Sequence, residues 1–120
     1  MTPTAPVYSV VFLGFTAFER NALAAYNRLS ASEAEPPLGV VDDLARADFV
    51  IVDGDDALAV DTVIAAGRHA DAVYVGAQAP DGALGWMMRP MDPLQVYREL
   101  HAAAAARDRR QRALPSAARR

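Results

Sequence analysis

The chain of 120 residues contains no cysteine and no lysine. Without cysteine it can form no disulfide bond, thiolate metal site or cysteine nucleophile, which fits a reducing compartment. Its first apolar run, Val7–Leu13, is too short to span a bilayer, and the first residues lack the basic region and cleavage pattern of a signal peptide. We therefore expect a cytoplasmic protein with no membrane partner.

Charge is divided unevenly along the chain. Residues 1–106 hold six arginines against fourteen acidic residues, a net charge of −8, whereas residues 107–120 hold six arginines against Asp108, a net charge of +5. The acidic part has the size and apolar content of one globular domain. We predict a single domain over residues 5–106 and a solvated basic tail or linker over residues 107–120, for which nucleic-acid binding is not expected.

Strand-like and helix-like patterns alternate along the domain. Short apolar runs rich in β-branched and aromatic residues predict buried strands at Val7–Leu13, Leu38–Val41, Phe49–Val52, Ala72–Val75 and Trp86–Met88. Helical patterns lie at Ala17–Leu29, from Asp55 or Asp56 to about His69, and after Asp92, with a brief helix between Asp42 or Asp43 and Ala47. This alternation predicts an α/β fold with one parallel sheet covered on both faces.

The first predicted helix has an apolar stripe and a polar start. Phe18, Ala22, Ala25, Tyr26 and Leu29 recur at helical spacing, which predicts that they form its inner face. Thr16 is the expected N-cap, and Glu19 lies in the first turn.

Four residues follow the predicted strands directly. They are Gly14, Asp53, Gly76 and Arg89. In open parallel sheets, ligands bind beyond the carboxyl ends of the strands, so we expect these residues to converge on one edge of the sheet.

Three segments resemble the receiver domains of bacterial two-component response regulators. Ala47–Asp53 is similar to the family's third strand and its phosphoacceptor aspartate, Val73–Ala77 to its fourth strand, and Gly85–Pro93 to its fifth strand with the Lys-Pro junction and final helix. The resemblance covers residues 7–106 and implies a doubly wound, flavodoxin-like sheet of five strands. It places Asp53 at the phosphoacceptor position. Gln78–Leu84 is too short and turn-rich for the family's fourth helix, which we expect to be shortened or missing.

The chain departs from the family pattern around Asp53. The family's acidic pair, which holds Mg²⁺ together with the phosphoacceptor, matches Gly14 and Phe15, and its switch Thr or Ser matches Gly76. The phosphoryl-contacting lysine matches Arg89, which can pair with Asp53 bidentately. We therefore expect no cofactor. Asp53 and Asp55 are weak candidates for a metal site because Mg²⁺ requires more oxygen ligands. Phe15 is expected to fill the pocket left by the missing ligand.

These departures favour an atypical receiver-like domain that acts through protein–protein interaction or dimerisation without phosphorylation, and that is not an enzyme. Its expected partners are a second copy, a histidine kinase or a downstream effector domain. One alternative is a phosphorylatable receiver that accepts a phosphoryl group on Asp53. Another is a domain that binds a small anionic ligand or nucleotide through Arg89 and backbone amides.

Other chemistry-bearing residues have simpler explanations. Asp42 and Asp43 follow the second strand and are expected to cap the helix after it. His69 and His101 have no nucleophile or carboxylate at motif spacing, and no P-loop or dinucleotide fingerprint is present. Trp86, Met87, Met88 and Met91 are expected to be core or sheet cover, with part of the set exposed for self-association where the fourth helix is missing.

Overall fold

The computed structural model describes residues 8–30 and 38–113. One parallel sheet has the strand order β2-β1-β3-β4-β5. Its strands are β1 (Tyr8–Leu13), β2 (Leu38–Val40), β3 (Phe49–Asp53), β4 (Ala72–Val75) and β5 (Gly85–Met87). The predicted α/β class with a doubly wound, five-stranded parallel sheet is confirmed, and the arrangement is consistent with a flavodoxin-like fold.

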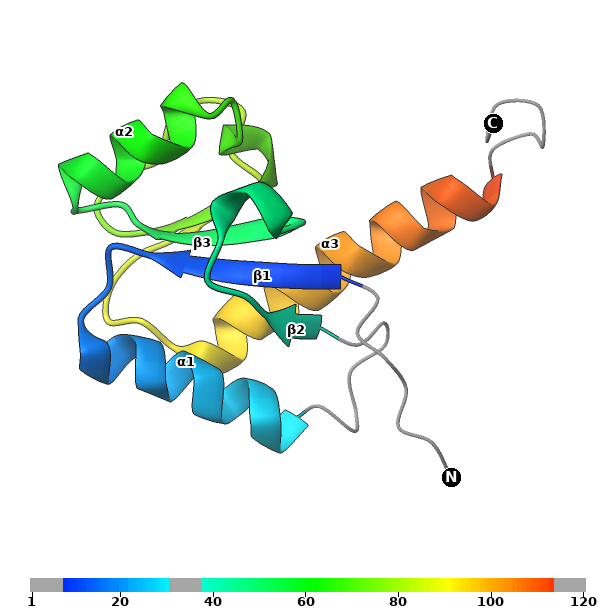
Figure 1. Ribbon diagram of the computed structural model, residues 1–120, viewed down its shortest axis with the longest axis horizontal. Coiled ribbons are helices and arrows are strands. Elements are labelled where there is room, and N and C mark those ends of the chain that lie inside the picture. Colours follow the sequence, from blue (N-terminus) through cyan, green and yellow to red (C-terminus); the bar gives the residue numbers. More distant parts are fainter. Residues whose placement is uncertain (1–7, 31–37, 114–120) are drawn as a thin grey trace.

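Three α-helices cover the sheet unequally. They are α1 (Ala17–Ser30), α2 (Ala57–Ala65) and α3 (Pro93–Ala113), with 3-10 turns at Leu44–Arg46 and His69–Asp71. Figure 1 shows α1 and α3 on one face of the sheet and α2 on the other. The described chain between β4 and β5 contains no helix. The expected loss of a fourth helix is therefore confirmed, and it leaves one face with a single helix.

The near-continuous apolar strands feed two separate cores because successive side chains point to opposite faces. The core beneath α1 and α3 contains Val10, Phe12, Phe49, Ile51, Val73, Val75 and Met87, which meet Leu23, Tyr97 and Leu100 from the helices. The core beneath α2 contains Val11, Val50, Val52 and Tyr74, which meet Ala59 and Val63. Burial on both faces explains why these strands do not alternate between apolar and polar residues.

The inner face of α1 differs from the predicted one. Leu23 is fully buried and its carbonyl accepts a hydrogen bond from the Tyr97 hydroxyl at 3.1 Å. Phe18 and Leu29, predicted to face the core, are 82% and 83% exposed. The prediction is wrong for these two residues because the buried side of the helix is centred on Leu23, well over a quarter of a turn from them at 100° per residue.

Helix α2 is shorter than predicted. Its C-cap is Ala66, and Gly67 takes the left-handed conformation with φ of +69°. Such a glycine commonly ends a helix. The chain then turns so that Arg68 reaches the carbonyl of Leu44 at 2.9 Å and Asp71 at 2.9 Å. The prediction that the helix continues to about His69 is therefore wrong.

Helix α3 runs past the predicted domain boundary at residue 106. The guanidinium of Arg107 lies 4.4 Å from the centroid of the Phe49 ring and pairs with Asp71 at 3.1 Å. These contacts attach to the sheet a residue predicted to begin a solvated tail, and the helix continues to Ala113. The other parts of those predictions, residues 5–7, 31–37 and 114–120, lie outside the described residues. Within residues 8–30 and 38–113, no helix combines the length and apolarity needed to cross a membrane.

Candidate functional site

The four residues that follow the strands do meet at one edge of the sheet. Asp53 ends β3, and Arg89, two residues beyond β5, reaches it with a distance of 2.8 Å between Nη2 and Oδ1. Gly14 and Gly76 follow β1 and β4 and lie against Asp53 and Asp55 respectively. The convergence expected from a parallel sheet therefore holds for all four residues.

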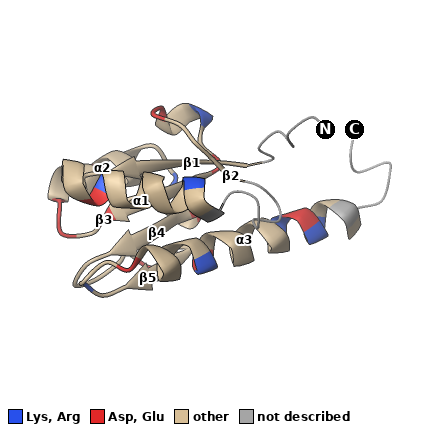
Figure 2. Cartoon of the chain, turned by 90° about the horizontal axis from the view of Figure 1, so that it is seen from below, with Lys and Arg blue, Asp and Glu red and all other residues tan. Residues whose placement is uncertain are grey.

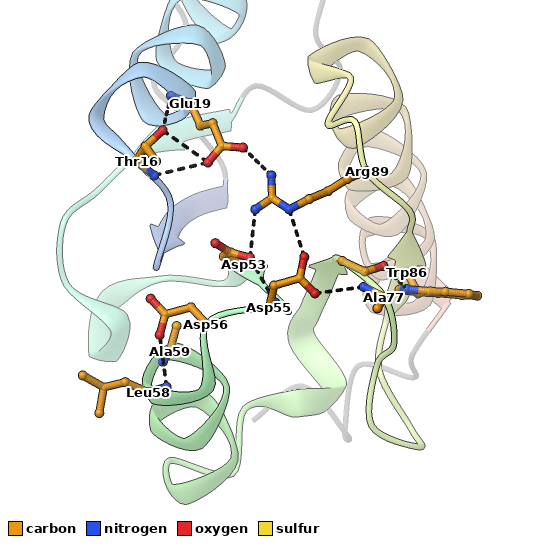
Figure 3. Close-up of polar contacts among 11 residues, drawn as sticks. Thr16, Glu19, Asp53, Asp55, Asp56, Leu58, Ala59, Ala77, Trp86 and Arg89 are labelled. Atoms are coloured by element: carbon orange, nitrogen blue, oxygen red, sulfur yellow. Dashed lines mark hydrogen bonds and ion pairs between the residues drawn. The ribbon is translucent and has the colours of Figure 1, made fainter.

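Arg89 is the centre of this edge (Figure 3). Besides Asp53, its guanidinium contacts Asp55 at 3.1 Å through Nε and Glu19 through Nη1. The three carboxylates come from α1, the end of β3 and the loop that follows it. We call Glu19, Asp53, Asp55 and Arg89 the carboxyl-edge network.

The predicted pairing of Asp53 with Arg89 is present, but its predicted bidentate geometry is wrong. One nitrogen of Arg89 contacts one oxygen of Asp53. The remaining nitrogen positions of the guanidinium contact Glu19 and Asp55 instead. Arg89 therefore joins three segments of the chain, a wider role than the pair suggested.

Glu19 was missed as a site residue, although the sequence carries a signal for its position. Thr16 and Glu19 form a capping box in which the Glu19 amide donates to Thr16 Oγ1 and the Thr16 amide donates to Glu19 Oε1, both at 3.2 Å. The cap holds one carboxylate oxygen and leaves Oε2 for Arg89. The start of α1 thus orients an acidic side chain toward the sheet edge.

Asp55 is held from three directions. Its amide donates to Asp53 Oδ1 at 3.0 Å, the Ala77 amide donates to its Oδ1 at 3.1 Å, and its Oδ2 receives Arg89. A Cβ atom on Gly76 would lie 2.7 Å from Asp55 Oδ1, closer than side-chain atoms normally approach. The glycine is therefore what allows Asp55 to occupy this position.

Gly14 likewise leaves room for the start of α2. Its φ of +88° lies in the left-handed region, and a Cβ there would lie 2.7 Å from the Cβ of Ala59. Asp56 caps this helix by accepting from the amides of Leu58 at 3.1 Å and Ala59 at 3.2 Å. Of the two residues predicted as possible caps, Asp56 takes that role and Asp55 joins the network.

Phe15 lies at the boundary between the network and the core. It is buried among the residues beneath α1 and α3. The guanidinium carbon of Arg89 lies 6.0 Å from the centre of its ring, at the outer limit of a cation–π contact. Phe15 thus packs as a core residue and covers one side of Arg89.

The ion pairs of the network shift the pKa values of Arg89 and Glu19. The hydrogen bond to Asp53, followed by the one to Glu19, raises the pKa of Arg89. Burial alone would raise the pKa of Glu19, but its hydrogen bonds with Arg89 and Thr16 outweigh burial and lower it. With one arginine facing three carboxylates, the network carries a net charge of −2 when all four groups are ionised.

The weak metal candidates Asp53 and Asp55 both direct an oxygen toward Arg89. Within the described part of the chain, no group of three or more His, Asp or Glu side chains is arranged to hold a metal ion. A guanidinium thus lies among the carboxylates, where it supplies positive charge but no open coordination position.

A second arginine network lies at the opposite edge of the sheet. Arg107 pairs with Asp71 and, at 3.7 Å, with Asp48, while Arg68 pairs with Asp71. Asp48 precedes β3 and accepts from the amide of Ser9 at 2.8 Å. We call Asp48, Arg68, Asp71 and Arg107 the amino-edge network. Its members are far apart in the chain and match no motif, so the sequence gives no signal for it.

Comparison with known proteins identifies no family for this chain. No protein-family model matches the chain. No curated protein matches it by sequence either. Its function must therefore be inferred from its own residues, and the carboxyl-edge network is the site that carries most information.

Proposed function

We propose that this chain is an atypical receiver-like signalling domain that acts through protein–protein interaction, without phosphorylation. The observation that carries the proposal is the occupation of Asp53 by Arg89 at 2.8 Å, with Glu19 and Asp55 on the same guanidinium. A carboxylate held in this way has the position of a phosphoacceptor but is bound within the protein.

Phosphoryl transfer to Asp53 would meet an electrostatic obstacle. The attacking oxygen and the incoming phosphoryl group are both negative, so the reaction needs concentrated positive charge at the site, which Mg²⁺ commonly supplies. Here the only cation contacting Asp53 in the described residues is Arg89, and two further carboxylates share it. A phosphoryl group would add negative charge to a network that already has a surplus.

The hydroxyl switch of receiver domains also lacks room. A side chain at position 76 would collide with Asp55, which lies where a hydroxyl would have to move. Asp55 instead links the loops after β3, β4 and β5 through Asp53, Ala77 and Arg89. Fixed contacts between loops support a domain with one stable conformation at this edge.

An exposed apolar surface supports interaction with another protein. Leu84, Trp86 and Met88, which we call the β5 patch, lie on or beside edge strand β5, and Trp86 and Met88 are 50% and 66% exposed. Trp86 pairs in register with Tyr74 on the α2 side of the sheet, where the fourth helix is missing. Its indole N–H donates to the Gly76 carbonyl at 3.0 Å. Trp86 is thus an oriented aromatic side chain of the kind that anchors interfaces.

The alternative of an anionic ligand has less support. An anion needs a cation whose charge is available, but each nitrogen position of Arg89 faces a carboxylate. Displacing one of them would bring the ligand next to the other two. The network therefore repels the class of ligand that Arg89 alone would attract.

The proposal is tested by exposing the full chain to acetyl phosphate and Mg²⁺, followed by intact-protein mass spectrometry and analytical ultracentrifugation. We expect no phosphoryl adduct on Asp53 and no change in oligomeric state. Stoichiometric modification of Asp53 with a change in oligomeric state would refute it. Asp53→Asn in parallel shows whether any adduct belongs to this residue.

A further inference from the structure

Helix α1 carries an apolar stripe with two exposed ends and a half-buried middle. Phe18, Ala22, Ala25 and Leu29 are separated by four, three and four residues, which places them on one side of a helix. Phe18 and Leu29 are the most exposed of the large apolar side chains described. The stripe is distinct from the buried side of α1, which is centred on Leu23.

The order of large and small residues in the stripe is the same from either end of the helix. Its order is large, small, small, large, and both pairs are centred on the midpoint between Leu23 and Ala24. A two-fold symmetric dimer brings one patch against its own copy. If two α1 helices lie antiparallel about this midpoint, Phe18 of one meets Leu29 of the other, and Ala22 meets Ala25. The alanines allow the two backbones to approach closely where the helices cross.

The charges of α1 lie near its two ends and leave the middle of the stripe open for pairing. Its charged residues, Glu19, Arg20 and Arg28, lie in its first and last turns, and Figure 2 shows the middle of the helix free of charge. Glu19 is turned inward to Arg89. Arg28 lies beside the stripe, on the same flank as Asn21. Antiparallel pairing places Arg28 next to the neutral Asn21 of the second copy, so no like charges meet along the stripe.

We propose that α1 is a homodimerisation surface on which a second copy of this chain docks antiparallel through Phe18 and Leu29. This deepens the proposed interaction function and rests on it. A helix of 14 residues is about 21 Å long at 1.5 Å per residue, so the area is below that of a permanent interface. The dimer is therefore weak and depends on concentration.

Sedimentation equilibrium of the full chain over a concentration series tests the pairing. The double variant Phe18→Gln, Leu29→Gln is expected to weaken dimerisation about tenfold or more, because each copy loses two apolar contacts. Both side chains are exposed in the monomer, so circular dichroism and thermal unfolding are expected to stay unchanged. Leu58→Gln on α2 is the matched control, since Leu58 is 77% exposed and lies outside the stripe.

The orientation is tested by cross-linking. The chain has no cysteine, so Asn21→Cys and Arg28→Cys introduce single thiols on the same flank of α1. With a short bis-maleimide, antiparallel pairing predicts that a mixture of the two variants forms mainly the mixed product. A predominance of the Arg28→Cys homodimer would overturn the orientation.

The outcomes separate this inference from the function on which it rests. A wild-type chain that stays monomeric at all concentrations overturns the α1 dimer, as does self-association that Trp86→Gln abolishes and the double variant leaves intact. Both results leave an interaction domain without phosphorylation standing. Phosphorylation of Asp53 would instead refute the proposed function and leave the α1 pairing to be judged by its own variants.

Discussion

The two edges of the sheet each hold an arginine network, and the two networks differ in charge balance. At the amino edge, Arg68 and Arg107 face two acidic residues, and Arg68 also donates to the carbonyls of Leu44, Ala47 and Asp48. At the carboxyl edge, Arg89 alone faces three carboxylates. The amino edge is neutral in its ionised form, whereas the carboxyl edge retains two negative charges.

This difference in charge balance indicates a structural role for the amino edge. Arg68 satisfies backbone carbonyls and Arg107 fastens α3 to the sheet, and both are contributions to the fold. At the other edge three carboxylates lie close together, and their like charges oppose folding except where Arg89 compensates them. The positive charge among these carboxylates is supplied by Arg89.

The largest expected effect is at the amino edge. Arg68→Met should lower the free energy of unfolding by about 3 kcal/mol, because partly buried carbonyls and Asp71 lose a charged donor. Urea denaturation measures the change. Arg46→Met, which removes exposed ion pairs with Asp42 and Asp43, is the control and should cost about 0.5 kcal/mol or less. Equal losses in the two variants would contradict a structural role for Arg68.

Arg89→Met should have the next largest effect, lowering the free energy of unfolding by about 2 kcal/mol at neutral pH, because three carboxylates lose their shared cation. The loss should shrink at high salt, where the charges are screened. The loss in Arg68→Met should respond much less to salt. If both variants showed the same salt response, the contrast between the edges would fail.

A smaller effect is expected at Gly76. Gly76→Ala should lower the free energy of unfolding by about 1–2 kcal/mol, because the added Cβ meets Asp55 Oδ1. Asp55→Ala in the same chain removes the obstructing carboxylate and should recover part of the loss. A double-mutant cycle by urea denaturation measures this coupling. Strict additivity of the two changes would show that Gly76 does not make room for Asp55.

The smallest effect is the pH dependence of Glu19. Its pKa is lowered from the ordinary value of 4.5, so its ionised form contributes stability that is present above that value and lost as pH falls through the lower folded-state pKa. Glu19→Gln should therefore reduce stability by about 0.5–1 kcal/mol at neutral pH and converge with the wild type in acid. Thermal unfolding from neutral pH down to about pH 3 measures this difference. A constant difference across that range would argue against an ionic role for Glu19.

Most of the fold could be predicted from the sequence because it follows local patterns. The apolar run Phe49–Val52 is long enough to identify a buried strand, and Pro93 after Asp92 identifies the start of α3. Errors arose where long-range contacts overrode the pattern. Arg107 docks on Phe49 and continues a helix that composition assigned to a tail. Leu23 rather than Phe18 turned inward because the apolar spacing of α1 fits two different sides of the helix.

The position of the site could be predicted from the sequence, but not all of its residues could. Strand ends in a parallel sheet must converge, so the meeting of Asp53 and Arg89 followed from topology. Glu19 contacts Arg89 across seventy positions of the chain, and no local spacing reports such a contact. The capping box at Thr16 fixes the orientation of Glu19, but only the path of α1 over the sheet brings it to the edge.

We propose that Arg89, bound to Asp53, leaves no role for Mg²⁺ and phosphoryl transfer at this residue. The most direct measurement is a titration of the full chain with Mg²⁺ in the presence of beryllofluoride, followed by the fluorescence of Trp86, the only tryptophan in the chain. Its indole contacts the Gly76 carbonyl, next to the residues that hold Asp55, so it reports on this edge. We expect a flat titration. A saturable change that Asp53→Asn abolishes would contradict the account.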